Sequence, residues 1–166
     1  MKADRPGFRM LRREQLFQEL VHDTYKLQKK LPEPTRCPDC GAVYHDGRWS
    51  WSWSGEAGAA HEERCPACHR IHDRFPAGYV TLKGSFFADH REEILQRVRS
   101  CEETEKRGHP LERLMAVEDT GEGVLVTTTG THLARRIGDA LYDAYRGELD
   151  YHYNKEENLL RVAWNR

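Results

Sequence analysis

Apolar residues from position 78 onward follow two periods along the chain, a period of two and a helical period of about 3.6. The period of two predicts strands at 79–87, 111–117, 124–129, 149–153 and 160–164. The helical period predicts two helices, whose inner faces carry Ile94, Val98 and Cys101 in the first and Leu133, Ile137, Leu141 and Ala144 in the second. The order β-α-β-β-α-β-β is the ferredoxin-like pattern with one added strand, so we expect an α+β domain over 78–166.

A different pattern precedes this domain. Residues 11–30 carry Leu16, Leu20 and Leu27 at helical spacing, whereas residues 1–10 show no periodicity and are expected to be irregular. The sequence Leu-Pro-Glu-Pro at 31–34 ends the helix, because proline cannot continue one. We therefore expect an N-terminal arm over 1–34, with a helix at about 11–30 and a hinge behind it.

The charge of the chain is unevenly distributed. The net charge is −1, but residues 1–36 hold nine Lys or Arg against five acidic residues, so the arm region carries +4 and the remainder −5. A basic arm on an acidic body is typical of contact with phosphate backbones, and it makes Lys26, Lys29 and Lys30 candidate RNA contacts. The alternative is a solvated amphipathic helix with no nucleic-acid partner.

Two Cys-x2-Cys pairs predict a zinc module over 35–77. Cys37 and Cys40 are separated by 24 residues from Cys65 and Cys68, and Gly41 suits the tight turn after the first pair. Zinc takes four thiolates in a tetrahedron, and we expect each pair to supply two of them from a knuckle. Redox cycling of a Cys-x2-Cys pair is the alternative. The prediction is a closed Zn²⁺ site in a zinc ribbon or treble-clef-like module, with no open position for catalysis.

Tryptophans and arginines supply the remaining candidate sites. Trp49, Trp51 and Trp53 alternate on one strand face, which either covers a poor module core or, with Arg48, stacks on RNA bases. Arg70 follows the second cysteine pair, and Arg135 and Arg136 lie near a helix start that suits a phosphate. Cys101 fits a small buried apolar residue. No nucleophile elbow, P-loop or dinucleotide fingerprint is present, so we expect neither an enzyme nor a small-molecule substrate.

The cellular setting follows from hydropathy and cysteine use. No apolar run approaches the ~18 residues of a membrane span, and the N-terminus lacks the apolar stretch of a secretory signal. Five cysteines without a signal are typical of a reducing compartment, where paired cysteines bind metal. We expect a cytoplasmic protein without membrane contact.

The cysteine module also resembles a known family. Cys37-Pro-Asp-Cys40-Gly41 followed by Gly47-Arg48-Trp49, and Cys65-Pro-Ala-Cys68-His69-Arg70, are similar to the cysteine pairs of the large-ribosomal-subunit export adaptors, the archaeal and eukaryotic family named for nonsense-mediated decay. The segment 123–136 is similar to that family's Gly-led strand and basic helix. The chain lacks the family's additional cysteine pairs, later barrel domains and export signals. It therefore looks like a short bacterial-type relative.

The resemblance implies contact with the ribosome but not nuclear export. We expect a non-enzymatic zinc protein that binds the large subunit, through rRNA or a ribosomal protein, as an assembly, quality-control or hibernation-type factor. The alternative from another class is a zinc-stabilised protein-interaction or stress-regulatory module without nucleic-acid contact.

Overall fold

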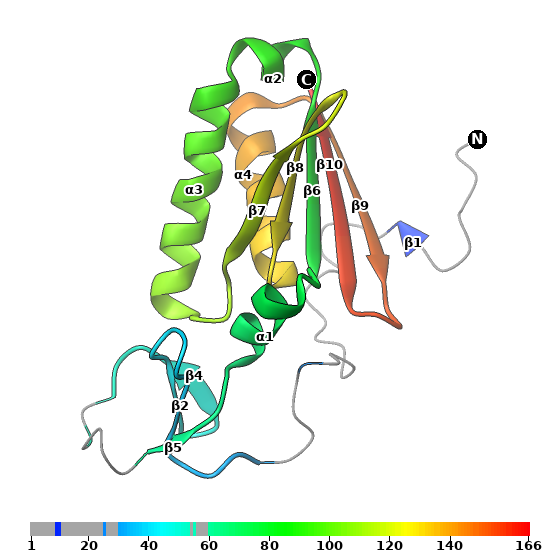
Figure 1. Ribbon diagram of the computed structural model, residues 1–166. Helices are drawn as coiled ribbons and strands as arrows, with labels where there is room; N and C mark the ends of the chain where they lie inside the picture. The colour runs from blue at the N-terminus through cyan, green and yellow to red at the C-terminus, as the bar shows by residue number, and fades with distance from the viewer. Residues whose placement is uncertain (1–8, 11–24, 26–29, 54, 56–59) are drawn as a thin grey trace.

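The computed structural model describes residues 9–10, 25, 30–53, 55 and 60–166. This part of the chain forms two mixed sheets and four helices, which confirms the α+β class (Figure 1). The larger sheet and its helices form a body, and the smaller sheet with its helix forms a cysteine module (residues 35–73). The module lies at the end of the body where the long helix α3 finishes, as Figure 1 shows.

The body contains the predicted order of elements with an extra short helix. Its elements are β6 (Gly78–Lys83), α2 (Ser85–Asp89), α3 (Arg91–Gly108), β7 (Leu114–Asp119), β8 (Gly123–Thr128), α4 (Thr131–Tyr145), β9 (Glu148–Asn154) and β10 (Leu159–Asn165). The strand predicted over 79–87 ends at Lys83, because Gly84 takes a φ of 109° and α2 begins after it. A positive φ of this kind is accessible to glycine at little cost and breaks the extended backbone.

The order of strands in the larger sheet is β1-β9-β10-β6-β8-β7. The final strand β10 pairs in parallel with β6 from Leu160↔Gly78 to Asn165↔Lys83, and the other neighbours pair antiparallel. The last strand of the closing hairpin therefore occupies the centre of the sheet and β9 lies outside it. The order of helices and strands along the chain matches the predicted ferredoxin-like order. A ferredoxin-like arrangement of these elements in space stays a prediction.

The edge strand β1 (Arg9–Met10) was not predicted, since residues 1–10 show no strand period. It pairs with β9 through Arg9↔Tyr153 and Met10↔His152. Backbone pairing with an existing edge requires no particular side chain, so no residue pattern marks this strand. The predicted helix at 11–30 lies outside the described residues apart from Tyr25, which is in a turn, and Lys30.

The core of the body is formed by the predicted apolar faces. Helix α4 packs on β6, β10 and α3. Ile94, Val98 and Cys101 of α3 are buried, as are Leu133, Ile137 and Leu141 of α4, whereas Ala144 is exposed. The alternating Leu160, Val162 and Trp164 of β10 are also buried.

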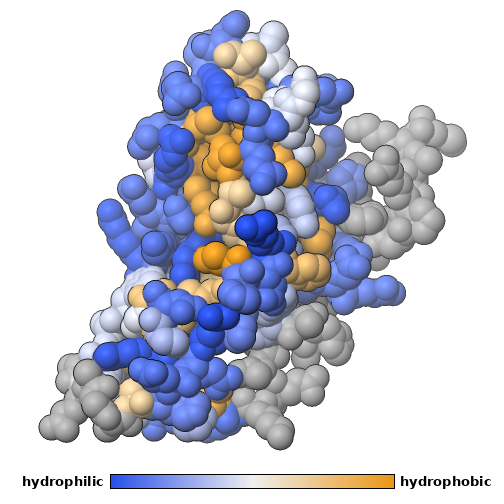
Figure 2. All heavy atoms as spheres, in the orientation of Figure 1, coloured by the Kyte–Doolittle hydropathy of each residue, from blue (hydrophilic) through white to orange (hydrophobic). Residues whose placement is uncertain are grey.

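The surface matches the low mean hydropathy of −0.85. Most of the face in Figure 2 is hydrophilic, and hydrophobic atoms gather mainly over the body beside α3. Within the described residues, no helix has both the length and the apolar character needed to traverse a bilayer.

The cysteine module is a small sheet followed by one helix. Its elements are β2 (Thr35–Arg36), β3 (Val43–His45), β4 (Arg48–Ser50), β5 (His61–Glu62) and α1 (Pro66–Asp73). The strand order is β4-β3-β2-β5, with β5 parallel to β2. These strands have two or three residues each, so their hydrogen bonds alone cannot hold the module together.

Gly121 in the β7–β8 turn and Gly123 at the start of β8 provide a matched test of the packing between β6 and β8. A Cβ at Gly123 would lie 2.0 Å from the carbonyl oxygen of Leu82, whereas a Cβ at Gly121 meets nothing within 4 Å. We expect Gly123→Ala to lower the free energy of unfolding by about 1–3 kcal/mol, because backbone must move. Gly121→Ala should change it by less than about 0.5 kcal/mol. Urea unfolding of both variants measures the difference, and equal stabilities would contradict the close approach of the two strands.

Candidate metal centre

The first cysteine pair lies in the turn between β2 and β3. The N–H of Cys37 donates to the oxygen of Ala42 at 2.8 Å, and the N–H of Gly41 donates to the oxygen of Cys37 at 2.9 Å. Gly41 has a φ of 81°, so it closes the turn in a conformation that other residues rarely adopt. This turn is the predicted knuckle, and it directs both sulfur atoms to the same side.

The second pair does not form a second knuckle, so that expectation was wrong. Cys65 is the N-cap of α1 and Cys68 lies in the first turn of the helix. The sulfur of Cys65 accepts a hydrogen bond from the N–H of Cys68 at 3.4 Å and takes the place of the oxygen that usually caps a helix. Pro66 at the first helical position is the sequence signal that could have identified this helix start. A knuckle on a hairpin plus a pair at a helix start is a treble-clef-like arrangement.

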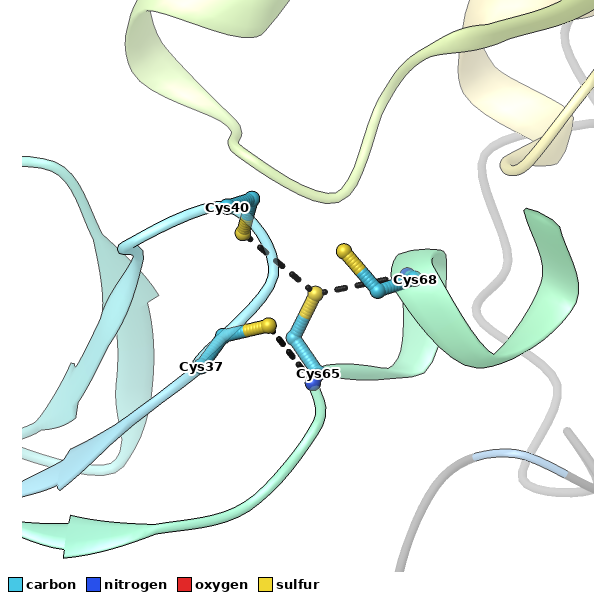
Figure 3. Close-up of side chains that lie close together, drawn as sticks. All are labelled: Cys37, Cys40, Cys65 and Cys68. Carbon is cyan, nitrogen blue, oxygen red and sulfur yellow. Dashed lines mark hydrogen bonds between the residues drawn. The ribbon is translucent and has the colours of Figure 1, made fainter. Parts of the chain in front are cut away.

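The four sulfur atoms converge to one point (Figure 3). All lie within 4.8 Å of one another, and Cys40 Sγ is 3.8 Å from Cys65 Sγ. A tetrahedral thiolate site with metal–sulfur bonds of about 2.3 Å separates its sulfurs by about 3.8 Å. All five cysteines of the chain are free thiols. The cluster therefore has the dimensions and the donor atoms to hold a metal ion.

The cluster is also the core of the module. Cys37 and Cys65 are fully buried and Cys68 is almost so, and with Ala67 they form the buried cluster against which Trp49 and Leu111 pack. Removing this cluster would leave the short strands with little core, chiefly the buried Ala42 and Val43. A metal ion is the usual way for so small a module to gain stability.

The surroundings of the sulfurs determine which thiols ionise. Burial raises the pKa of Cys65, and it raises the pKa of Cys68 to about 11. Burial also acts on Cys37, but the backbone N–H groups of Cys65, Cys40 and Asp39 together lower its pKa to about 7. A cation is therefore needed before all four sulfurs can be thiolates at neutral pH.

Sequence reasoning missed Arg113, which contacts the cluster from the body. Its guanidinium donates to Cys68 Sγ at 3.3 Å, to Cys65 Sγ at 3.2 Å and to Cys40 Sγ at 3.4 Å. The residue was placed in a strand over 111–117, but β7 begins only at Leu114. The two residues before Leu114 contact groups outside the sheet. Glu112 accepts a hydrogen bond from α4, and Arg113 donates hydrogen bonds to the sulfurs. A single arginine carries no sequence signal for such a contact.

A second group of potential ligands forms where Glu33, which precedes β2, meets the end of β3 and the turn after it. Glu33, His45 and Asp46 are all exposed. The carboxylate of Glu33 accepts the N–H groups of Asp46 and Gly47 at 3.2 and 3.1 Å. These bonds give Glu33 a structural role in holding the turn.

The tryptophans contact the protein itself. Strand β4 ends at Ser50, so the three indoles do not share one strand face. Trp49 packs against the cysteine cluster and Tyr44, and the indole N–H of Trp51 donates to the Lys106 oxygen at 2.6 Å. Trp53 is half-buried beyond the strand. The contacts of Trp49 favour the covering role, whereas Trp51 is 37% exposed despite its hydrogen bond.

Several candidate RNA contacts are engaged within the protein. Arg70 is 2% exposed, its guanidinium donates to the Phe75 oxygen at 3.1 Å, and it lies 4.5 Å from the Tyr25 ring centre. The expectation of a surface role for Arg70 was therefore wrong, because the packing of α1 buries it.

The other candidates differ in exposure. Arg135 is mostly buried and pairs with Asp139 at 3.5 Å, whereas Arg136 is exposed and pairs with Glu105 at 3.7 Å. Arg48 and Lys30 are exposed. Lys26 and Lys29 lie outside the described residues.

Comparison with known proteins assigns the chain to no family and no function. No known protein family, curated protein or solved structure matches the chain significantly. Fold and site therefore define the class directly, an α+β protein with a four-cysteine cluster that could hold a metal ion. The resemblance to the ribosomal export adaptors stays a prediction.

Replacing a ligand should unfold the module. In Cys40→Ser and Cys65→Ser we expect loss of bound metal and of the near-UV dichroism of the neighbouring indoles, because a structural metal contributes on the order of 10 kcal/mol to a small domain. Cys101→Ser is the control, since this buried thiol lies in the α3 face and not in the cluster. Metal analysis and circular dichroism check both results. A Cys65→Ser protein with full metal content and a native spectrum would contradict the site.

Metal affinity should depend steeply on pH. The raised pKa values of Cys65 and Cys68 keep both thiols protonated in the metal-free protein between pH 6 and 8, so metal binding must displace their protons. Affinity should rise with pH by about tenfold per pH unit for each displaced proton, hence at least about 100-fold per unit, and more steeply below pH 7, where Cys37 with a pKa of about 7 also releases its proton. Competition with a chelator of known pH dependence measures this slope. A pH-independent dissociation constant would show that these sulfurs do not bind the metal.

Proposed function

We propose that this protein is a non-enzymatic, zinc-stabilised binding protein of the cytoplasm that associates with the large ribosomal subunit. It acts there as an assembly, quality-control or hibernation-type factor. The observation that carries the zinc-stabilised part of the proposal is the four-cysteine cluster, and the ribosomal part rests on the sequence resemblance and on the basic N-terminal region. Four protein sulfurs fill a tetrahedral shell, so the metal has no position for substrate and serves to hold a binding surface in shape.

Zinc is the metal that fits this donor set best. Thiolate ligands in a tetrahedron select zinc or iron, and structural zinc sites are typically closed and four-coordinate. Burial of Cys37 and Cys65 excludes solvent from the cluster and suits a structural ion.

The basic N-terminal region supports a partner that carries phosphates. Residues 1–36 have a net charge of +4, and Arg48 and Lys30 are exposed. Two described parts of the arm contact the rest of the protein. Strand β1 pairs with β9, and the hydroxyl of Tyr25 donates to Asp73 of α1 at 2.9 Å. These contacts support an arm that acts together with the body and the module as one surface.

A protein-interaction or stress-regulatory role is the second candidate function. It is favoured by the intramolecular partners of Arg70, Arg135 and Arg136, which reduce the positive charge available to RNA. The net charge of −5 on residues 37–166 acts in the same direction, because an acidic surface repels nucleic acid.

Sedimentation with ribosomes at two salt concentrations tests the leading proposal. We expect the tagged protein to co-migrate with the large subunit or with whole ribosomes at low salt. Binding should weaken at physiological salt, because each neutralised phosphate contributes about 0.7–0.9 to the slope of log K against log salt.

Lysine variants sharpen this experiment. The triple change Lys26→Gln, Lys29→Gln and Lys30→Gln should reduce the slope by about two to three. Lys155→Gln is the control, since this exposed lysine lies in the turn between β9 and β10 of the acidic body. A protein that stays at the top of the gradient at every salt concentration contradicts ribosome association and favours the second candidate.

A further inference from the structure

Arg113 reaches the cysteine cluster from the other part of the protein. It lies immediately before β7 of the body, whereas all three sulfurs that it contacts belong to the module. Its N–H···S distances of 3.2–3.4 Å are those of hydrogen bonds to sulfur. The side chain is only 8% exposed. A buried guanidinium that crosses between two substructures is a specific and costly arrangement, so its partner must carry compensating charge.

The body fixes this arginine independently of the sulfurs. The backbone N–H of Arg113 donates to Thr129 Oγ1 at 2.9 Å, and its side-chain Nε donates to the Pro110 oxygen at 2.8 Å. The N–H of Thr129 returns a bond to the Arg113 oxygen at 2.9 Å. The bonds with Thr129 hold the backbone of Arg113, and the bond to the Pro110 oxygen holds its guanidinium. The guanidinium therefore contacts the module as a positive charge whose position is set by the body.

Neighbouring residues connect the same short segment to both long helices. The carboxylate of Glu112 accepts the N–H of Leu133 in the first turn of α4 at 3.0 Å. The N–H of Leu114 donates to the carboxylate of Glu102 in α3 at 2.8 Å. Residues 112–114 thus join α3, α4 and the cysteine cluster. The bond from Trp51 to the Lys106 oxygen at the end of α3 is a second link between module and body.

Formal charge explains why the loaded cluster needs this residue. Four thiolates around a divalent ion leave a net charge of −2 in a site that is largely closed to water. A guanidinium in hydrogen-bond contact offsets half of that charge, and charge-assisted hydrogen bonds are about twice as strong as neutral ones. Loss of the metal removes the centre on which the sulfurs are assembled, and with it the anionic partner of Arg113.

We propose that Arg113 couples metal binding in the module to the docking of the module on the body. With the metal bound, Arg113 holds the module against α3 and the start of β7. Without the metal, the module separates from the body, and residues 112–114 and the start of α4 lose a restraint. The protein presents one continuous surface only in the loaded state. This inference rests on the cluster and does not require a ribosomal partner.

Zinc titration of the full chain with a competing chelator tests the affinity side of the coupling. Arg113→Ala should raise the dissociation constant about 10–100-fold, as expected when an outer partner of a metal ligand is lost. Arg113→Lys keeps the charge but not the planar fork and should give a smaller increase. Arg91→Ala is the control, since Arg91 pairs with Asp119 elsewhere on the body. The zinc dissociation constant of this variant should stay within about threefold of that of the unaltered protein.

Hydrogen exchange tests the docking side and separates coupling from simple packing. In the unaltered protein, removal of zinc with EDTA should speed exchange at residues 112–114 and 131–133 as well as in the module. In Arg113→Ala saturated with zinc, exchange at 112–114 should already be fast while the cysteine segments stay protected. Unchanged zinc affinity in Arg113→Ala overturns the proposal. If that variant does not fold, the unaltered protein still decides the question. An exchange rate at residues 112–114 that does not change when zinc is removed would then overturn the proposal.

Discussion

The convergence of four sulfur atoms is the constraint on which the rest of the module depends. Cys37 and Cys40 come from a turn between two very short strands, and Cys65 and Cys68 come from a helix start beyond a long loop. Apart from them the module has little core, since its buried cluster consists of three of these cysteines and Ala67, and Ala42 and Val43 are the other buried apolar residues in the part of the module that the structure describes. Holding these segments together costs backbone entropy that so few apolar contacts do not offset. A metal ion bound among the sulfurs would supply the missing stabilisation.

The same cluster determines how the module meets the body. The body has its own apolar core, built from α3, α4 and the central strands, and it does not need the module for its interior. Contact between the two combines the packing of Leu111 on the cysteine cluster with a small number of polar links, above all the three hydrogen bonds from Arg113 to sulfur. A site that stabilises the module therefore also orients it. A metal ion held by these sulfurs would thereby also fix the position of the module relative to the body.

Sequence patterns predicted the elements better than their contacts. The alternation of Leu160, Val162 and Trp164 and the helical spacing of Leu133, Ile137 and Leu141 depend on burial along one element, and both predictions were confirmed. The cysteine spacing likewise identified residues that converge in space. The strand predicted from residue 111 begins three residues later, at Leu114. Glu112 and Arg113 contact residues that are distant in the sequence, and local periodicity does not reveal such contacts. The parallel pairing of β10 with β6 was not predicted, since residue periodicity carries no information on which strands become neighbours.

X-ray absorption at the metal edge of the purified protein tests the central claim most directly. The account predicts about one zinc ion per chain with four sulfur neighbours at about 2.3 Å and no nitrogen or oxygen ligand. Nitrogen or oxygen neighbours at about 2.0 Å would show an open or mixed site and would contradict a closed tetrathiolate centre. A protein that binds no metal while keeping its native fold would contradict the dependence of the module on the cluster.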